Sequence, residues 1–158
     1  MDKLALFKVT SIDWTDVFSR IRNAAGYPKP GYLTHEAVQW SDIHKKWFFL
    51  PRKASKTIYR EEEDQWKGCN LLITSCANLC SFNITEIEII GYRHPERGYS
   101  SFDFIPDTND ELIVALKSEE VDGRKTKSFI TVFSINGTVL LKDSRLEDEY
   151  KFEGIYFV

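Results

Sequence analysis

The first clear periodicity in the chain is helical. Apolar side chains recur every three or four residues between residues 14 and 25, which places them on one face of a helix. The members of this face are Trp14, Phe18, Ile21 and Ala25. Asp13 or Thr15 can cap the start of the helix, and Gly26 is typical of the residue just beyond its end. A short strand is also expected over residues 4–10.

After residue 31 the pattern changes to short apolar or alternating runs separated by turns. The expected strands cover residues 32–40, 47–50, 70–75, 82–90, 101–105, 111–117, 128–133, 138–141 and 152–158. Pro51 is expected to end the second strand, because proline cannot donate a hydrogen bond to a sheet ladder. Asn136-Gly137 predicts a type I′ hairpin turn.

The strands fall into two groups of about four, preceded by the helix and followed by one further strand. Four strands per unit with a spare closing strand is typical of β-propeller blades. Polar residues at or beside the first strand of each unit, namely Glu36, Ser100 and Glu153, recur at blade-sized intervals of roughly 50 to 65 residues. Two blades cannot close a ring. The pattern alone leaves a sandwich or a barrel as alternatives.

Composition narrows the classes of protein further. The chain has 158 residues, enough for one domain or a piece of a larger one, and its 11 Phe, 7 Tyr and 4 Trp favour strands. A net charge of −3 disfavours a general nucleic-acid binder. No apolar run approaches the roughly 20 residues of a membrane span, and the first residues do not indicate a signal peptide.

The three cysteines, Cys69, Cys76 and Cys80, have no zinc-site spacing and are expected to be small, partly buried thiols. Their odd number excludes complete pairing within the chain. A Cys76–Cys80 or a Cys69–Cys76 disulfide stays open if the compartment is oxidising. The sequons at Asn83 and Asn136 permit a secreted protein without requiring one.

Six short segments carry a family resemblance that runs in order from about residue 11 to the end of the chain. They are GYLTHEA (31–37), WSD (40–42), WFFLPRKAS (47–55), GYSSFDFIP (98–106), IVALKSEE (113–120) and FEGIYF (152–157). Together they resemble the C-terminal half of the calcium-activated apyrase family. This is a family of soluble nucleotidases of the secretory pathway that also occurs in the saliva of blood-feeding arthropods.

The resemblance implies a fold and an activity. The family is a five-bladed β-propeller with calcium in its central tunnel, and it hydrolyses nucleoside di- and triphosphates such as UDP, GDP or ADP to monophosphate and phosphate. We therefore expect an all-β, partial five-bladed propeller of about two blades, a preceding short helix and a closing strand. Residues 1–158 would form its C-terminal part, with no independent second domain. The alternative is a non-catalytic, truncated propeller module that retains only part of the calcium site.

The same resemblance implies where the protein works and what it meets. The location implied is the endoplasmic reticulum, the Golgi or the extracellular space. The partners implied are nucleoside di- and triphosphates. Because blades expect neighbours, we also expect self-association through the open blade edges.

In the family pattern three motif residues contribute to the calcium site, and these are Glu36, Ser100 and Glu153 in this sequence. Calcium takes six to eight oxygen ligands, which carboxylates and hydroxyl groups can supply. Glu153 stands alone in an aromatic segment, where burial is costly unless the carboxylate is paired or metal-bound. The alternative interpretation is an exposed strand position for each glutamate and an ordinary turn position for the serine.

Arg52 and Lys53 are candidates for contacts to nucleotide phosphates, since arginine can bind phosphate oxygens in a fork and lysine offers a point charge. The alternative is that both are solvated loop charges. The runs Glu61–Asp64 and 117–120 are expected to be solvated. His35 is a candidate general base, but a packed strand histidine is the favoured interpretation.

Overall fold

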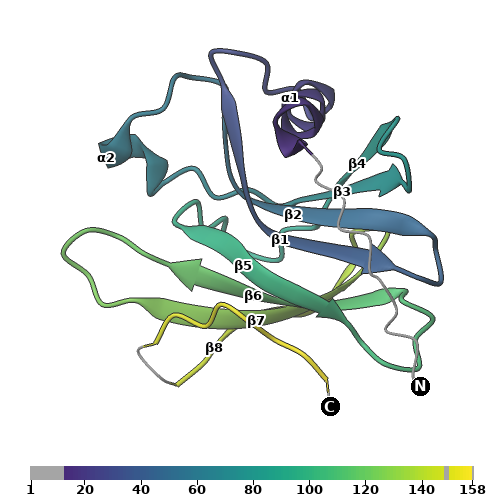
Figure 1. Cartoon of the computed structure of the whole chain (residues 1–158). Helices are drawn as coiled ribbons and strands as arrows, with labels where there is room; N and C mark the ends of the chain where they lie inside the picture. Colours follow the sequence, from purple (N-terminus) through teal and green to yellow (C-terminus); the bar gives the residue numbers. More distant parts are fainter. Residues whose placement is uncertain (1–12, 148–149, 158) are drawn as a thin grey trace, which may run out of the picture.

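A computed structural model describes residues 13–147 and 150–157, so the strand expected over residues 4–10 lies outside the described residues. The described chain forms two four-stranded antiparallel sheets and two helices (Figure 1). The first sheet has the order β1 (Tyr32–Ser41), β2 (Lys46–Ser55), β3 (Leu71–Cys76), β4 (Phe82–Glu86). The second has the order β5 (Arg97–Phe104), β6 (Leu112–Glu119), β7 (Lys127–Ser134), β8 (Val139–Arg145). The helices are α1 (Trp14–Ala24) and α2 (Glu61–Asp64).

The predicted helix is confirmed as α1. Asp13 caps it, since its Oδ1 accepts a hydrogen bond from the Thr15 N–H at 2.8 Å. Gly26 follows the helix with a φ of +82°, the left-handed conformation that ends many helices. Of the predicted face, Ile21 is buried against the first sheet and Trp14, Phe18 and Ala25 pack partly buried around it; Val17, outside the predicted face, is buried as well.

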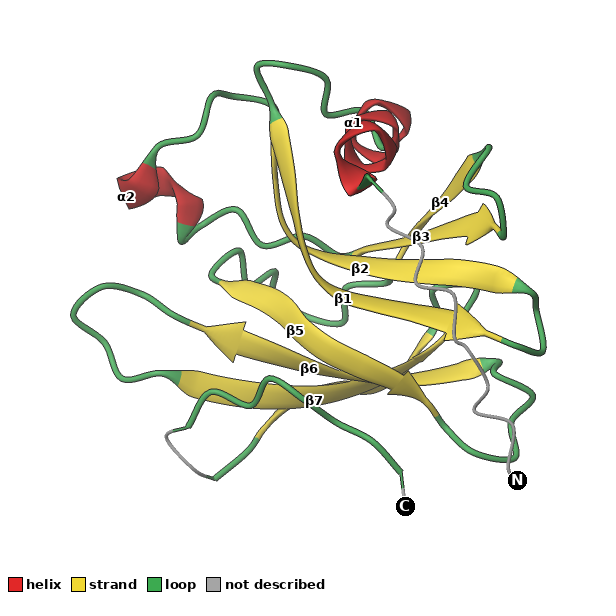
Figure 2. Cartoon of the chain, viewed as in Figure 1, coloured by secondary structure: helices red, strands yellow, loops and turns green. Residues whose placement is uncertain are grey.

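The elements stack in three layers, with α1 on one face of the first sheet and the second sheet on the other (Figure 2). The packing of strand β2 explains why residues 47–50 of this strand are all apolar. Phe48 and Leu50 join the cluster between the sheets, whereas Phe49 joins the cluster beneath α1. Because both faces of this strand are covered, neither face needs polar side chains.

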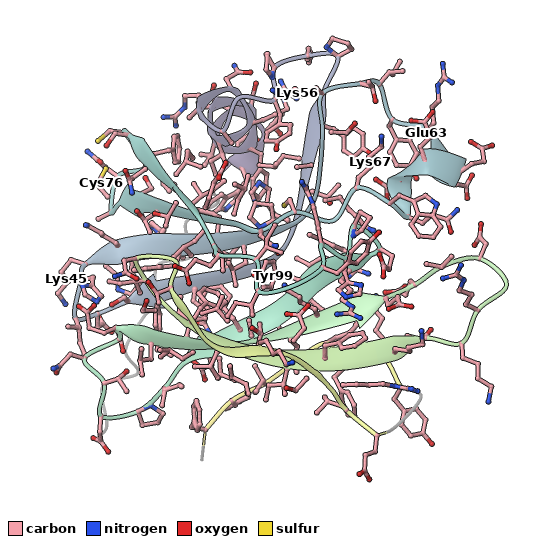
Figure 3. All side chains as sticks on the ribbon, turned by 180° about the vertical axis from the view of Figure 1, so that it is seen from behind. Lys45, Lys56, Glu63, Lys67, Cys76 and Tyr99 are labelled. Atoms are coloured by element: carbon pink, nitrogen blue, oxygen red, sulfur yellow. The ribbon has the colours of Figure 1, made fainter. Side chains whose placement is uncertain are left out.

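The core between the sheets draws on both units. Its buried members are Ala37, Phe48, Leu50, Leu72, Ile87, Tyr99, Phe102, Ile113, Ala115 and Phe133. Tyr99 is the largest of them with no exposure to solvent, and its ring lies between the sheets in Figure 3. Burial of this apolar area joins the two sheets into one body.

Pro51 does not end its strand, contrary to the prediction, because β2 continues to Ser55. The β1–β2 register is irregular at this point: Pro51 lies opposite His35, with register shifts on both sides of that pair. A proline is tolerated within a sheet where the ladder is already interrupted by a bulge.

The turn at Asn136-Gly137 joins β7 to β8 as predicted, but its type differs. Gly137 has a φ of +94°, whereas Asn136 is not among the residues of positive φ, and a type I′ turn needs positive φ at both. The Gly137 N–H donates to the Ser134 carbonyl at 2.8 Å, so the turn spans residues 134–137 and begins one residue earlier than a turn centred on Asn136-Gly137 would. The glycine then takes the left-handed position after the turn.

The predicted closing strand is not formed by residues 150–157, which are irregular. This segment lies against the second sheet and is fastened by serine hydroxyl groups instead of a backbone ladder. Ser128 Oγ donates to the Tyr150 carbonyl at 2.7 Å and Ser100 Oγ donates to the Phe152 carbonyl at 2.8 Å. The Phe152 N–H donates back to Ser128 Oγ at 3.2 Å. The segment is held in place without main-chain pairing to a strand.

Candidate metal and phosphate site

Two irregular positions face each other across β1 and β2. Glu36 is skipped in the register of β1, and Arg52 is skipped in the register of β2. A residue that leaves the ladder at a bulge can aim its side chain in a new direction. Here the two side chains meet, with Arg52 Nη1 3.1 Å from Glu36 Oε2.

The second sheet repeats this irregularity at the corresponding strand. Ser100 is skipped between the pairs Tyr99–Lys117 and Ser101–Leu116 of β5 and β6. Its hydroxyl is buried and donates to the Phe152 carbonyl, next to Glu153. Two of the three residues predicted to bind calcium thus lie at bulges in the first strand of each sheet.

A chain of ion pairs joins Glu36 to Glu153, and we call its five members the charged network: Glu36, Arg52, Glu120, Lys151 and Glu153. Arg52 Nη2 lies 2.6 Å from Glu120 Oε1, and Lys151 Nζ lies 3.3 Å from the same oxygen. Lys151 Nζ is also 2.7 Å from Glu153 Oε1. The network therefore connects the first sheet, the end of β6 and the C-terminal segment.

The network is unevenly buried. The Arg52 side chain is 7% exposed, whereas those of Glu36 and Glu120 are 40% and 41% exposed. The arginine therefore lies inside, and its carboxylate partners reach toward solvent. Gly98 makes room for this packing, because a Cβ at that position would lie 2.5 Å from Arg52 Cγ and 2.8 Å from its carbonyl oxygen.

The pKa values of the central groups reflect these contacts. Burial on its own would raise the pKa of Glu120, but the charge of Arg52, with hydrogen bonds from Ser118 and Lys151, leaves that pKa below its ordinary value. The hydrogen bond to Glu153 raises the pKa of Lys151. Both groups are charged at neutral pH, so the network holds three carboxylates against two cations.

The donor set suits a hard cation. Glu36, Glu120, Glu153 and Ser100 supply only oxygen atoms, and oxygen is what calcium prefers. In this arrangement Arg52 and Lys151 neutralise the carboxylates. No three acidic, histidine or cysteine side chains within residues 13–147 and 150–157 form a group that could hold a metal ion. These side chains therefore match calcium in donor type alone, because the described residues do not gather them into a metal-holding group.

The other two residues singled out from the sequence lie elsewhere. Lys53 is buried and its Nζ donates to the Gln65 carbonyl at 3.2 Å, beside α2, while burial lowers its pKa. His35 stacks on Phe18 of α1, with ring centroids 5.0 Å apart, and neither ring nitrogen has a hydrogen-bond partner. Burial lowers the pKa of His35 to about 4. His35 therefore has the geometry of a packed histidine.

The run at 117–120 is not solvated as expected. Lys117, Ser118 and Glu119 are buried, and Glu120 is the centre of the charged network. Sequence reasoning missed Glu120 and Lys151 as members of the site. The position of the run directly after an apolar strand is a signal for the burial of residues 117–119, because β6 continues to Glu119, but it does not indicate the ion pairs of Glu120 or Lys151.

The run Glu61–Asp64 forms the short helix α2, where a loop was expected. Its acidic side chains are exposed or partly exposed, as predicted. Glu63 forms ion pairs with Arg60 and Lys67, and Asp64 Oδ1 accepts a hydrogen bond from the Tyr32 hydroxyl at 2.6 Å. The run therefore fastens α2 to the start of β1.

A separate cavity of about 380 Å³ lies between the segment after β4 and strands β5 to β8. Its lining is mixed, and its polar and charged members include Arg97, Tyr99, Lys117, Lys142, Asp143 and Arg145. Lys117 Nζ lies 3.1 Å from Asp143 Oδ1 within it, and the buried Tyr99 hydroxyl has no hydrogen-bond partner. None of the five site residues predicted from the sequence lines this cavity.

The fold and the charged network define an all-β protein with a carboxylate-rich polar site that joins two antiparallel sheets. The family model described as Apyrase matches residues 5–158, and the chain belongs to the apyrase family. It is 46% identical over 145 residues to apyrase apy-1 of Caenorhabditis elegans. It is 42% identical over 146 residues to soluble calcium-activated nucleotidase 1 of Rattus norvegicus, and 37% identical over 151 residues to the apyrase of Cimex lectularius.

These matches cover the chain far more completely than they cover the relatives. They span 92%, 92% and 96% of this chain, but 40%, 35% and 40% of the three relatives in the same order. The chain thus spans well under half the length of the curated relatives that it matches. No helix of the described residues is long and apolar enough to cross a membrane.

Proposed function

We propose that this chain supplies part of a calcium-dependent nucleotidase that hydrolyses nucleoside di- and triphosphates, such as UDP, GDP or ADP, to monophosphate and phosphate. The observation that carries the proposal is the charged network. It brings Glu36 and Glu153 into one chain of contacts, with Ser100 bonded to the residue beside Glu153. Membership in the apyrase family and the similarity to soluble calcium-activated nucleotidase 1 of Rattus norvegicus support it.

Glu36, Ser100 and Glu153 are the residues of this chain that we propose to hold calcium. When bound, calcium neutralises phosphate charge and polarises a phosphoryl oxygen. Glu36 and Glu153 are 40% and 68% exposed, so their carboxylates are accessible to an ion from solvent. The remaining ligands would come from water, main-chain oxygens or residues outside the described part.

Arg52 is the residue that we propose to touch the nucleotide phosphates. Its guanidinium group has five N–H donors in a fork, and Nη1 and Nη2 donate to Glu36 and Glu120. A bound phosphate would compete with these carboxylates for the same donors. Lys53 is a weaker candidate, because its ammonium group is buried beside Gln65 and would act through its charge.

We further propose that the two sheets are two blades of a five-bladed propeller, with residues 1–158 as its C-terminal part. Each sheet is a four-stranded antiparallel meander, and the two sheets pack face to face, as blades do. The secretory pathway or the extracellular space is the location that we propose by family. The sheet edges at β4 and β8 are the surfaces through which we propose self-association.

The test measures phosphate release from UDP, GDP and ADP by the purified chain, with calcium and then with a chelator. Release that needs calcium supports an enzyme. The absence of such release, in a folded chain, supports the alternative of a non-catalytic module that keeps part of the site. Calorimetric titration with calcium then separates a module that binds the ion from one that does not.

A variant pair assigns the metal role. Glu153→Gln keeps the size of the side chain and removes its charge, and Glu61→Gln makes the same change on α2, outside the network. We expect Glu153→Gln to weaken calcium binding at least about tenfold, whereas Glu61→Gln leaves it unchanged. Equal calcium binding by both variants would show that Glu153 is not a ligand.

A further inference from the structure

Two thiols meet at the turn between β3 and β4, and neither belongs to the charged network. Cys76 ends β3 and Cys80 lies just before β4, and both are free cysteines. Their Sγ atoms are 2.8 Å apart, and the Cys80 N–H donates to Cys76 Sγ at 3.3 Å. Figure 3 shows Cys76 on the outside of the molecule, and Cys80 is exposed.

The turn that brings the thiols together has an unusual backbone. Leu79 has a φ of +56°, a left-handed conformation that is uncommon for a residue other than glycine. Its N–H donates to the Cys76 carbonyl at 3.0 Å, and its side chain is buried in the cluster beneath α1. The tight turn therefore places Cys80 back over Cys76.

The same turn anchors the helix. Arg20 of α1 donates from Nη1 to the Leu79 carbonyl at 2.7 Å, and its guanidinium group lies 5.7 Å from the centre of the Phe82 ring. Val17 and Ile21 of α1 share the buried cluster with Leu79. A covalent bond across the turn would fix the carbonyl and the side chain to which α1 docks.

The three cysteines do not share one thiol environment, and the pKa values of Cys76 and Cys69 are shifted in opposite directions. Hydrogen bonds from the Cys80 thiol, the Cys80 N–H and the Ser81 N–H lower the pKa of Cys76 to about 6. Lys46 of β2 is its cross-strand partner. Cys69 is the opposite case: its buried thiol donates to the Pro51 carbonyl at 3.2 Å, and burial raises its pKa to about 12.

We propose that Cys76 and Cys80 form a dithiol–disulfide site that reacts with low-molecular-weight disulfides of the glutathione class. The Cys76 thiolate attacks one sulfur of the disulfide, which forms a mixed disulfide and releases one thiolate. Cys80, after loss of its proton to solvent, attacks the Cys76 sulfur and releases the second thiolate. The two cysteines lose two electrons, and the small disulfide gains them as two thiols.

This assignment selects between the two disulfides that the sequence leaves open. Cys76 has Cys80 in contact, whereas the Cys69 thiol bonds to Pro51 within the structure. The oxidised form locks the turn that carries Leu79, so α1 is held more firmly in the disulfide form than in the dithiol form. Oxidising compartments, such as those of the secretory pathway, would favour the disulfide.

The test incubates the reduced chain with glutathione disulfide and counts thiols by alkylation and intact mass. We expect a loss of two of the three thiols, no retained glutathione, and a peptide map that links Cys76 to Cys80. Cys69→Ser is the matched control and should lose both of its two thiols. Amide hydrogen exchange in α1 should slow in the oxidised form relative to the reduced form.

Single replacements make the proposal falsifiable. In Cys80→Ser, Cys76 has no partner, so it should retain one glutathione as a stable mixed disulfide. Three thiols that all survive incubation, a link through Cys69, or glutathione retained on the parent chain would each overturn the proposal. Nucleotide hydrolysis is not part of this test, so its outcome is independent of the proposed function.

Discussion

Arg52 offers the sharpest test of the charged network, through the substitution Arg52→Met. Methionine keeps an unbranched apolar side chain in the space beside Gly98, and it removes the guanidinium group. The change therefore isolates the two ion pairs to Glu36 and Glu120, at 3.1 and 2.6 Å, from the packing of the alkyl chain. We expect the variant to fold and to be less stable.

The magnitude follows from the burial of the groups involved. A hydrogen bond to a charged group contributes about 1.5–3 kcal/mol to the free energy of unfolding. Both carboxylates are two-fifths exposed and regain water when the arginine is removed, so the lower end of that range applies to each. The expected loss is about 3 kcal/mol, which corresponds to a fall in Tm of about 6–12 °C for a chain of this size.

The assay is urea unfolding followed by tryptophan fluorescence, with Lys53→Met as the matched control. Lys53 is the next residue of the same strand and is as buried as Arg52, but its ammonium group bonds only to the neutral Gln65 carbonyl among the contacts described. Its replacement should cost less than about 1 kcal/mol. Equal losses in the two variants would refute the view that the ion pairs, rather than burial of a long side chain, hold this part of the structure together.

Three further outcomes follow from the packing. Burial lowers the pKa of His35 to about 4, so the unfolded chain binds more protons than the folded chain between pH 6.5 and 4. The free energy of unfolding should therefore fall by up to about 3 kcal/mol as the pH drops through that window, measured by denaturant titration. His35→Phe should flatten this pH profile. Asp143→Asn leaves the buried Lys117 ammonium without a counter-charge and should cost about 3 kcal/mol by the same method, whereas a loss below 0.5 kcal/mol would contradict the pairing. Gly137→Ala should cost about 2 kcal/mol in thermal unfolding, because φ is +94° and the new Cβ would meet the Glu86 carbonyl at 2.5 Å; an unchanged Tm would show that the turn relaxes freely.

The strand pattern could be predicted because each sheet needs its own apolar faces. Alternation around Phe102 and the continuous apolar run at Phe48 and Phe49 reflect burial on one or on two faces, and both features are local in the sequence. Pro51 shows the limit of local reasoning. Whether Pro51 ends the strand depends on the register of the partner strand β1, where it lies opposite His35.

The candidate site shows the same division. Glu36 and Ser100 could be selected from the sequence through motifs, and both occupy bulges in the structure. Glu120 and Lys151 could not be selected, because their importance comes from contacts with Arg52 and Glu153 across elements distant in the chain. Nothing in the local sequence of an acidic run distinguishes a solvated charge from one that pairs with a buried arginine.

The sequence by itself determined the elements: one amphipathic helix, two groups of four strands, and the family to which those strands belong. Periodicity is sufficient for the helix and the strands, because burial of one face imposes a repeat on consecutive residues, whereas the family rests on the resemblance of the six motif segments. Only the tertiary structure decided which charges are paired, that residues 150–157 are fastened by hydroxyl groups and not by a ladder, and which two thiols meet. These outcomes depend on which side chains come close in space, because ion pairs weaken with distance and a disulfide forms only between neighbouring sulfur atoms.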